Sequence, residues 1–216
     1  AFSADGRWLA TVNIRGQVVV RSVSGGIELA RLANPRQRPS RERILFSNDG
    51  RYLASAHADE IRVWNLEAAP ERIRLAGHPY AIPTTTYVPD GKTVITGGKD
   101  ALIQWWDANS GQRRESVSTQ RGNVQSVICS RDGRWMVTAH WNDPDATIRV
   151  WDLAQHRQVG SLVEPKMGDV CGIAVWQQGR YLAASGRGLI IWELPEDWTT
   201  DTPREVFYQS GDQGLC

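Results

Sequence analysis

The chain has 216 residues, and its 25 basic and 24 acidic side chains nearly cancel to a net charge of +1. This balance gives no basic field for nucleic acid or an anionic membrane, so we expect neither as a partner. No apolar run reaches the roughly 18 residues that cross a bilayer. The three cysteines, Cys129, Cys171 and Cys216, are odd in number and lack metal-ligand spacing. This pattern argues against a disulfide scaffold and makes a reducing, cytoplasmic location the default expectation.

Short apolar segments separated by turns follow one another along the chain, and no segment sustains a helical period. The sequence therefore predicts an all-β protein. In chain order, the predicted strands are 8–13, 17–23, 27–32, 43–47, 52–56, 61–66, 72–76, 93–96, 101–106, 112–118, 124–130, 135–140, 147–153, 158–163, 170–176, 181–185, 189–194 and 204–209.

These segments belong to one unit that is copied five times. A turn glycine recurs at intervals of 44, 41, 42 and 46 residues, in Asp5-Gly6, Asp49-Gly50, Asp90-Gly91, Asp132-Gly133 and Gln178-Gly179. A bulky residue and a small, apolar run follow each glycine. An aromatic then closes the next strand in four copies, as Trp64-Asn65, Trp106-Asp107, Trp151-Asp152 and Trp192-Glu193, and Arg21 stands there in the first. A period of this length decides the fold.

The repeat resembles the WD-repeat (Trp-Asp repeat) β-propeller family, which has a period of about 40 to 45 residues and GH and WD marks. The resemblance implies four-stranded antiparallel blades, here at approximately 1–38, 39–79, 80–121, 122–167 and 168–216. The first copy starts within a blade and the last residues could only begin another strand. We therefore expect a fragment of a longer, seven-bladed WD-repeat protein, with a closed five-bladed ring as the alternative. The arginine-rich composition suggests a bacterial source.

The resemblance also implies a structural hydrogen-bond network in the third copy. Its members would be a loop histidine, a strand threonine, a hairpin aspartate and the strand tryptophan, namely His78, Thr96, Asp100 and Trp106. A buried indole N–H needs an acceptor, and an Asp–His pair can supply one through a hydroxyl. Partial versions are expected as Asp59 with Trp64 and as Asp145 with Trp151.

Four residues are candidates for partner contact. Arg36 and Arg38 lie in a proline-containing loop, where a docking patch competes with an ordinary solvated loop. Trp141 lies in a hairpin insertion and either contacts a partner or packs locally. Trp105 and Trp106 must point in opposite directions along their strand, so we expect Trp105 to face the neighbouring blade or solvent.

The function predicted from the resemblance is a non-catalytic scaffold that binds a protein or peptide. It could be the sensor or regulatory region of a multidomain signalling protein. The alternative is a propeller-fold hydrolase with a site in the central channel. Such an enzyme needs convergent acids, a metal or a nucleophile, and the sequence offers no such cluster and no nucleophile-elbow motif. We therefore expect neither enzymatic activity nor a cofactor.

Overall fold

The computed structural model describes residues 1–13, 17–32, 43–57, 60–67, 72–75, 77–143, 147–163, 167–195, 198 and 201–210. Within them, strands form five antiparallel sheets, which we call blades 1 to 5. Blade 1 holds β1 (Trp8–Val12), β2 (Val18–Ser22) and β3 (Glu28–Leu32). Blade 2 holds β4 (Arg43–Phe46), β5 (Tyr52–His57), β6 (Glu60–Asn65) and β7 (Arg72–Leu75). Blade 3 holds β8 (Thr84–Tyr87), β9 (Thr93–Gly97), β10 (Leu102–Asp107) and β11 (Arg113–Ser118). Blade 4 holds β12 (Asn123–Cys129), β13 (Trp135–Trp141), β14 (Thr147–Asp152) and β15 (Arg157–Val163). Blade 5 holds β16 (Gly172–Trp176), the short 3₁₀ helix η2 (Gln177–Gly179), β17 (Tyr181–Ser185), β18 (Gly188–Glu193) and β19 (Arg204–Ser210).

Each blade is a simple meander in which consecutive strands pair. In blade 1, a single antiparallel bridge between Phe2 and Leu9 stands where the other blades have their innermost strand. The all-β prediction is confirmed, because every long element among the described residues is a strand.

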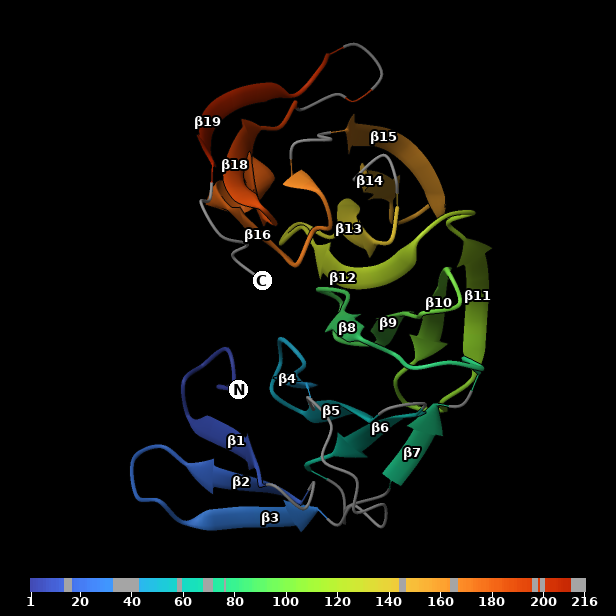
Figure 1. Ribbon diagram of the computed structural model, residues 1–216. Helices are drawn as coiled ribbons and strands as arrows, with labels where there is room; N and C mark the ends of the chain where they lie inside the picture. The colour runs from blue at the N-terminus through green and yellow to red at the C-terminus, as the bar shows by residue number, and fades with distance from the viewer. Residues whose placement is uncertain are drawn as a thin grey trace.

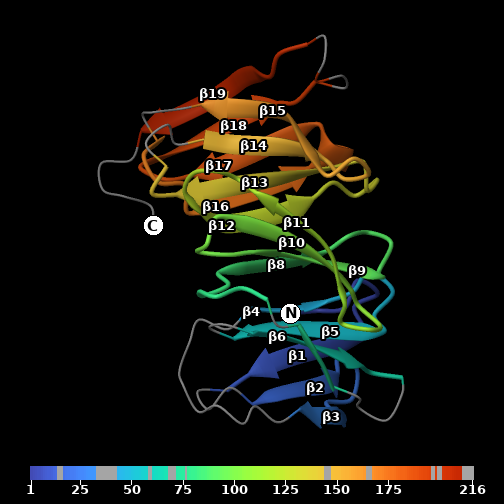
Figure 2. The same ribbon diagram turned by 90° about the vertical axis from the view of Figure 1, so that its right-hand side faces the viewer.

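The blades stand around a common centre and form an arc (Figure 1). The first strands of blades 2 to 5, namely β4, β8, β12 and β16, lie near that centre, and β3, β7, β11, β15 and β19 lie at the periphery. Seen from the side, the sheets stack face against face, with blades 1 and 5 at opposite ends of the stack (Figure 2). This is the radial arrangement of a β-propeller.

The hydrophobic core lies between the blades and not inside any one of them. Trp106 packs with Ala54 and Val63 of blade 2, whereas Trp105 packs with Val124 and Met136 of blade 4. Alternate side chains of one strand thus fill two different interfaces. The expectation that Trp105 faces the neighbouring blade is correct, and the alternative that it faces solvent is wrong, because only 2% of it is exposed.

The turns between the first two strands of a blade share one set of hydrogen bonds. In blade 2, Ser47 Oγ donates to Asp49 Oδ1 over 2.6 Å and accepts from the Tyr52 amide over 3.0 Å. The same Ser–Asp pairing closes the turns of blades 1 and 4. Gly50 has φ +73°, a conformation that other residues adopt only with strain. The Asp-Gly pairs recur because this turn needs both residues.

Two further observations bear on the compositional expectations. Cys129 is a free thiol, and Cys171 is disulfide-bonded. None of the helices in the described ranges has the length and apolar character that a membrane crossing needs.

Candidate functional site

A buried chain of hydrogen bonds joins four side chains of blade 3. The Trp106 indole N–H donates to Thr96 Oγ1 over 3.0 Å, and Thr96 Oγ1 lies 2.7 Å from His78 Nε2. The other ring nitrogen, His78 Nδ1, lies 2.8 Å from Asp100 Oδ2. An indole only donates, so the simplest relay runs from Trp106 to Thr96, then to His78, and from its Nδ1–H to Asp100. The structure thus brings together the four side chains that the resemblance implied.

Four different segments supply these side chains. Thr96 lies on β9 and Trp106 on β10, while His78 lies in the loop before β8. Asp100 lies in the β9–β10 turn, where its Oδ1 also accepts from the Leu102 amide over 3.1 Å. Burial lowers the pKa of His78 and outweighs the opposing effect of Asp100, so the imidazole is neutral at pH 7.

Two glycines make room for this network. A Cβ atom on Gly98 would stand 2.2 Å from Asp100 Oδ1 and 2.3 Å from His78 Nδ1. A Cβ atom on Gly77 would stand 2.7 Å from Cη2 of Trp106. These distances are far below van der Waals contact, so the imidazole and the indole occupy the space that larger residues would need.

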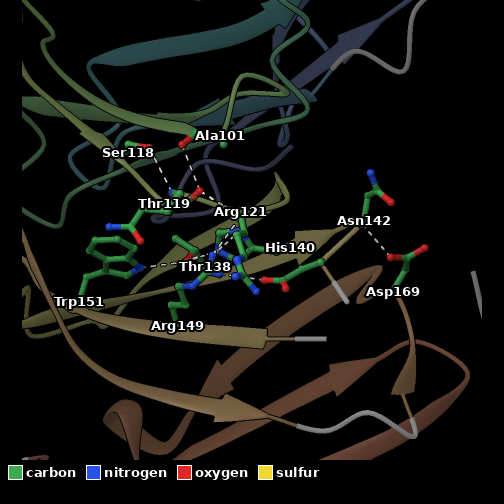
Figure 3. A network of polar contacts seen from close by, with 12 residues as sticks. Ala101, Ser118, Thr119, Arg121, Thr138, His140, Asn142, Arg149, Trp151 and Asp169 are labelled. Carbon is green, nitrogen blue, oxygen red and sulfur yellow. Dashed lines mark hydrogen bonds and ion pairs between the residues drawn. The ribbon is translucent and has the colours of Figure 1, made fainter. Parts of the chain in front are cut away.

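Blade 4 builds a related network from different positions (Figure 3). Trp151 Nε1 donates to Thr138 Oγ1 over 2.9 Å, and that oxygen lies 2.9 Å from His140 Nε2. His140 lies on β13, whereas His78 comes from a loop. Arg149 donates through Nη2 to Asp143 Oδ2 over 2.9 Å, and its Nη1 lies 2.9 Å from His140 Nδ1. Burial and the adjacent guanidinium lower the pKa of His140 to about 3.

The register explains how the two networks correspond. Thr96 pairs with Gln104 across β9 and β10, and Thr138 pairs with Arg149 across β13 and β14. Both partners hold the loop that leads into their blade: Gln104 Nε2 donates to the Gly77 carbonyl over 3.2 Å, and Arg149 Nη1 donates to the Arg121 carbonyl over 3.3 Å.

Blades 3 and 4 place a histidine and a glycine at opposite positions: blade 3 has the histidine in the entering loop, and blade 4 has it on the strand. His140 stands two residues after Thr138, in the position that Gly98 holds after Thr96. The loop entering blade 4 carries Gly122, where a Cβ atom would stand 3.2 Å from the Cβ of His140. Space that the loop side chain fills in blade 3 is therefore filled by the strand side chain in blade 4.

The remaining predicted site residues lie in different environments or outside the described residues. Arg36, Arg38, Asp59 and Asp145 lie outside the described residues. Trp64 is buried in the core between blades 1 and 2. Trp105 is buried too, so its assignment as a partner contact is wrong: a residue covered by blade 4 cannot meet a partner. Trp141 is 46% exposed.

Sequence reasoning missed His140, Asp143 and Arg149. The available signal was the position of Arg149 two residues before Trp151, which matches Gln104 before Trp106. A buried charged side chain such as Arg149 needs a partner of opposite charge. That requirement points to an acidic residue nearby, and Asp143 is one.

Neither network has the form of a hydrolytic centre. The hydroxyls of Thr96 and Thr138 are buried and each already receives an indole hydrogen bond, so neither can reach a substrate. Within the described ranges, no group of three or more His, Cys, Asp or Glu side chains could hold a metal ion. The chemistry that these residues support is the fixing of loops against strands.

The radial blades with their buried Trp–Thr–His networks define a repeat-built β-propeller. The family model "WD40: WD domain, G-beta repeat" matches residues 70–107 and 114–152. The Periodic tryptophan protein 2 homolog of Dictyostelium discoideum is 27% identical over 161 residues, which is 72% of this chain and 17% of that protein. WD repeat-containing protein 3 of Homo sapiens is 31% identical over 110 residues, which is 51% of this chain and 11% of that protein. These matches support the assignment of the chain to the WD40-repeat family.

A solved structure agrees with the fold. A chain from "Crystal Structure of Mitotic Checkpoint Complex" superposes with a TM-score of 0.82 at 19% identity, over 99% of this chain and 65% of that one. At this identity the likeness concerns the fold alone. The chain spans less than a fifth of the two curated relatives, so the activities of those whole proteins do not transfer to it directly.

The lowered pKa of His140 makes stability depend on pH. Below its unfolded value of about 6.5, the unfolded chain binds a proton that the folded chain does not bind until about pH 3. Stability therefore falls as pH decreases through this window, by about 1.4 kcal/mol per unit. Urea unfolding at pH 7 and pH 5 should show a loss of about 2 kcal/mol from this residue. His140→Gln should reduce the loss by that amount; equal losses in wild type and His140→Gln would contradict the assignment.

Proposed function

We propose that this chain is a non-catalytic scaffold that binds a protein or peptide through the loops at one end of its blades. The observation that carries the proposal is the exposure of Trp141, which is 46% exposed at the end of β13. The amide of the adjacent Asn142 donates to Asp169 Oδ1 over 2.8 Å, which ties the hairpin to the loop entering blade 5 (Figure 3). Exposed tryptophans on rigid supports are typical anchors of protein interfaces.

A second exposed aromatic lies at the same end of the blades. In an antiparallel meander, the loop between the second and third strands and the loop into the next blade lie at one end. Trp141 belongs to the first kind of loop in blade 4. Tyr80, which is 63% exposed, belongs to the second kind, before blade 3. These loops together offer an aromatic contact surface.

The alternative, a hydrolase in the central channel, has less support. Of the nucleophilic side chains near the centre, Cys129 is mostly buried, and burial raises the pKa of its thiol to about 12. A thiol of this kind is not ionised at neutral pH and is a poor nucleophile. The scaffold therefore fits the described residues better.

The experiment is affinity capture with the purified chain, followed by affinity measurement on each captured protein with the Trp141→Ser variant. We expect at least one partner whose binding weakens about tenfold or more, which corresponds to about 1.4 kcal/mol. Val163→Ser removes another exposed apolar side chain, on the outer strand of blade 4, and should bind normally. The proposal fails if Trp141→Ser retains full affinity for every captured protein, or if the chain hydrolyses ester, peptide or phosphoester substrates.

We also propose the wider setting expected from the sequence: a cytoplasmic, bacterial protein in which this chain is part of a seven-bladed propeller attached to signalling domains. The open arc in Figure 1 and the small share of each relative that the chain spans support the larger propeller in this proposal. Sequencing the gene on both sides of the segment tests it. Two further repeats within about 90 residues would support the larger propeller, and their absence would count against it.

A further inference from the structure

A hollow lies at the other end of the blades, near the centre of the arc. It has a volume of about 670 Å³, within the range of ligand sites. Every blade contributes the residue that stands directly before its recurring Asp-Gly or Gln-Gly pair. In chain order, these residues are Ala4, Asn48, Pro89, Arg131 and Gln177.

The turn that presents these residues is the repeated one, whereas the residues themselves vary. In blade 4, Ser130 Oγ donates to Asp132 Oδ1 over 2.5 Å on either side of Arg131. In blade 2, Ser47 and Asp49 flank Asn48 in the same way. The fold thus holds Ala4, Asn48 and Arg131 on turns that the same Ser–Asp bond closes, and such preorganisation reduces the entropy lost on binding.

The described lining carries one charged group, the guanidinium of Arg131. Arg131 forms no ion pair with the residues that the structure describes, and its side chain is exposed. The nearby Arg180 differs, because it pairs with Glu193 over 2.7 Å. Arg131 is thus the cationic side chain of the lining, although the carboxylates of Asp49 and Asp90 lie near the lining residues Tyr87 and Cys129. Its exposed guanidinium can pair with one negative group of a ligand.

The rest of the lining suits a peptide. Trp176 contributes an exposed indole that is stacked on Tyr181, with ring centroids 5.5 Å apart. The amides of Asn48 and Gln177 offer both donors and acceptors for peptide groups. The indole of Trp176 can pack against an apolar side chain of a ligand, while Arg131 pairs with a carboxylate next to it.

We propose that this hollow binds an extended peptide in which an acidic residue neighbours an apolar one. Arg131 pairs with the carboxylate, and Trp176 packs against the apolar side chain. The site lies at the opposite end of the blades from Trp141, so it is a second interaction surface beyond the scaffold contact proposed above.

An array of Gly-Ser-x-z-Gly-Ser peptides, with every pair of amino acids at x and z, provides the probe. The full chain should bind most strongly where Glu or Asp neighbours Trp, Phe or Leu. Arg131→Gln should abolish the preference for acidic residues, and Trp176→Ala should abolish the preference for aromatic neighbours, each weakening the best peptides about tenfold or more.

Two variants serve as controls. Arg134→Gln removes a cation from the same turn that does not line the hollow, and it should bind as wild type does. Trp141→Ser should also bind normally, so failure of the scaffold proposal and failure of this one are distinguishable. The proposal is overturned if the array shows no acidic preference, if that preference survives Arg131→Gln, or if Arg134→Gln weakens binding equally.

Discussion

Replacing Thr96 with valine is expected to lower the free energy of unfolding by about 2 to 4 kcal/mol. Valine keeps the shape of threonine, so packing in β9 changes little. Two buried groups lose their partner, however: the Trp106 indole N–H and His78 Nε2. Each buried polar group left without a hydrogen bond costs about 1 to 3 kcal/mol. Urea unfolding of the wild type and Thr96→Val at pH 7 measures the difference. The comparison assumes that the unfolding free energy depends equally on urea concentration in both proteins.

The matched variant for this test is Thr96→Ser, which retains the hydroxyl and loses one methyl group. Its expected cost is about 1 kcal/mol, from the buried methyl alone. Thr138→Val should repeat the valine effect in blade 4, because Thr138 Oγ1 also accepts from an indole. Equal losses for Thr96→Val and Thr96→Ser would mean that the hydroxyl contributes nothing, and the relay would then have no energetic role.

The fold was predictable because its repeating parts are local. Gly50, Gly91 and Gly133 adopt φ values of +73°, +69° and +71°, so the same backbone demand recurs wherever the turn recurs. The tryptophan that closes the third strand recurs because the same interface recurs between blades. A local requirement that repeats leaves a period in the sequence, and the period is enough to predict blades.

The environment of Trp105 was less predictable because it depends on both neighbours of a blade. Alternation along a strand predicts that Trp105 and Trp106 point in opposite directions, but not that both directions are covered. In this structure blade 2 covers Trp106 and blade 4 covers Trp105. An exposed aromatic face would require a blade with only one neighbour.

The polar networks show the same limit. In blade 3 the implied histidine stands in its expected loop, so the resemblance locates it. In blade 4 the histidine moves to β13 and acquires Arg149 and Asp143, through contacts that join separate segments. The hollow that contains Arg131 is similarly invisible in the sequence, because only the radial placement of the blades brings the five turns together.

The different positions of His78 and His140 in their blades lead to a second prediction with a large effect on the free energy of unfolding. Gly98→His should destabilise the chain by about 3 kcal/mol or more. A Cβ atom at this position would stand 2.2 Å from Asp100 Oδ1, and Asp100 cannot move away without breaking its buried bond to His78. Overpacking and the loss of a buried pair each cost this order of free energy. Urea unfolding of the single variant provides the measurement.

The double variant His78→Gly with Gly98→His tests the exchange itself. It copies the arrangement of blade 4, where Gly122 lies in the loop and His140 on the strand. Because the new imidazole enters space that the old one has left, the double variant should be at least about 1.5 kcal/mol more stable than the sum of the two single losses implies. Recovery should be partial, since blade 3 has Gln104 where blade 4 has Arg149. Strictly additive losses would show that the two imidazoles do not share one space, and the correspondence between the blades would then be wrong.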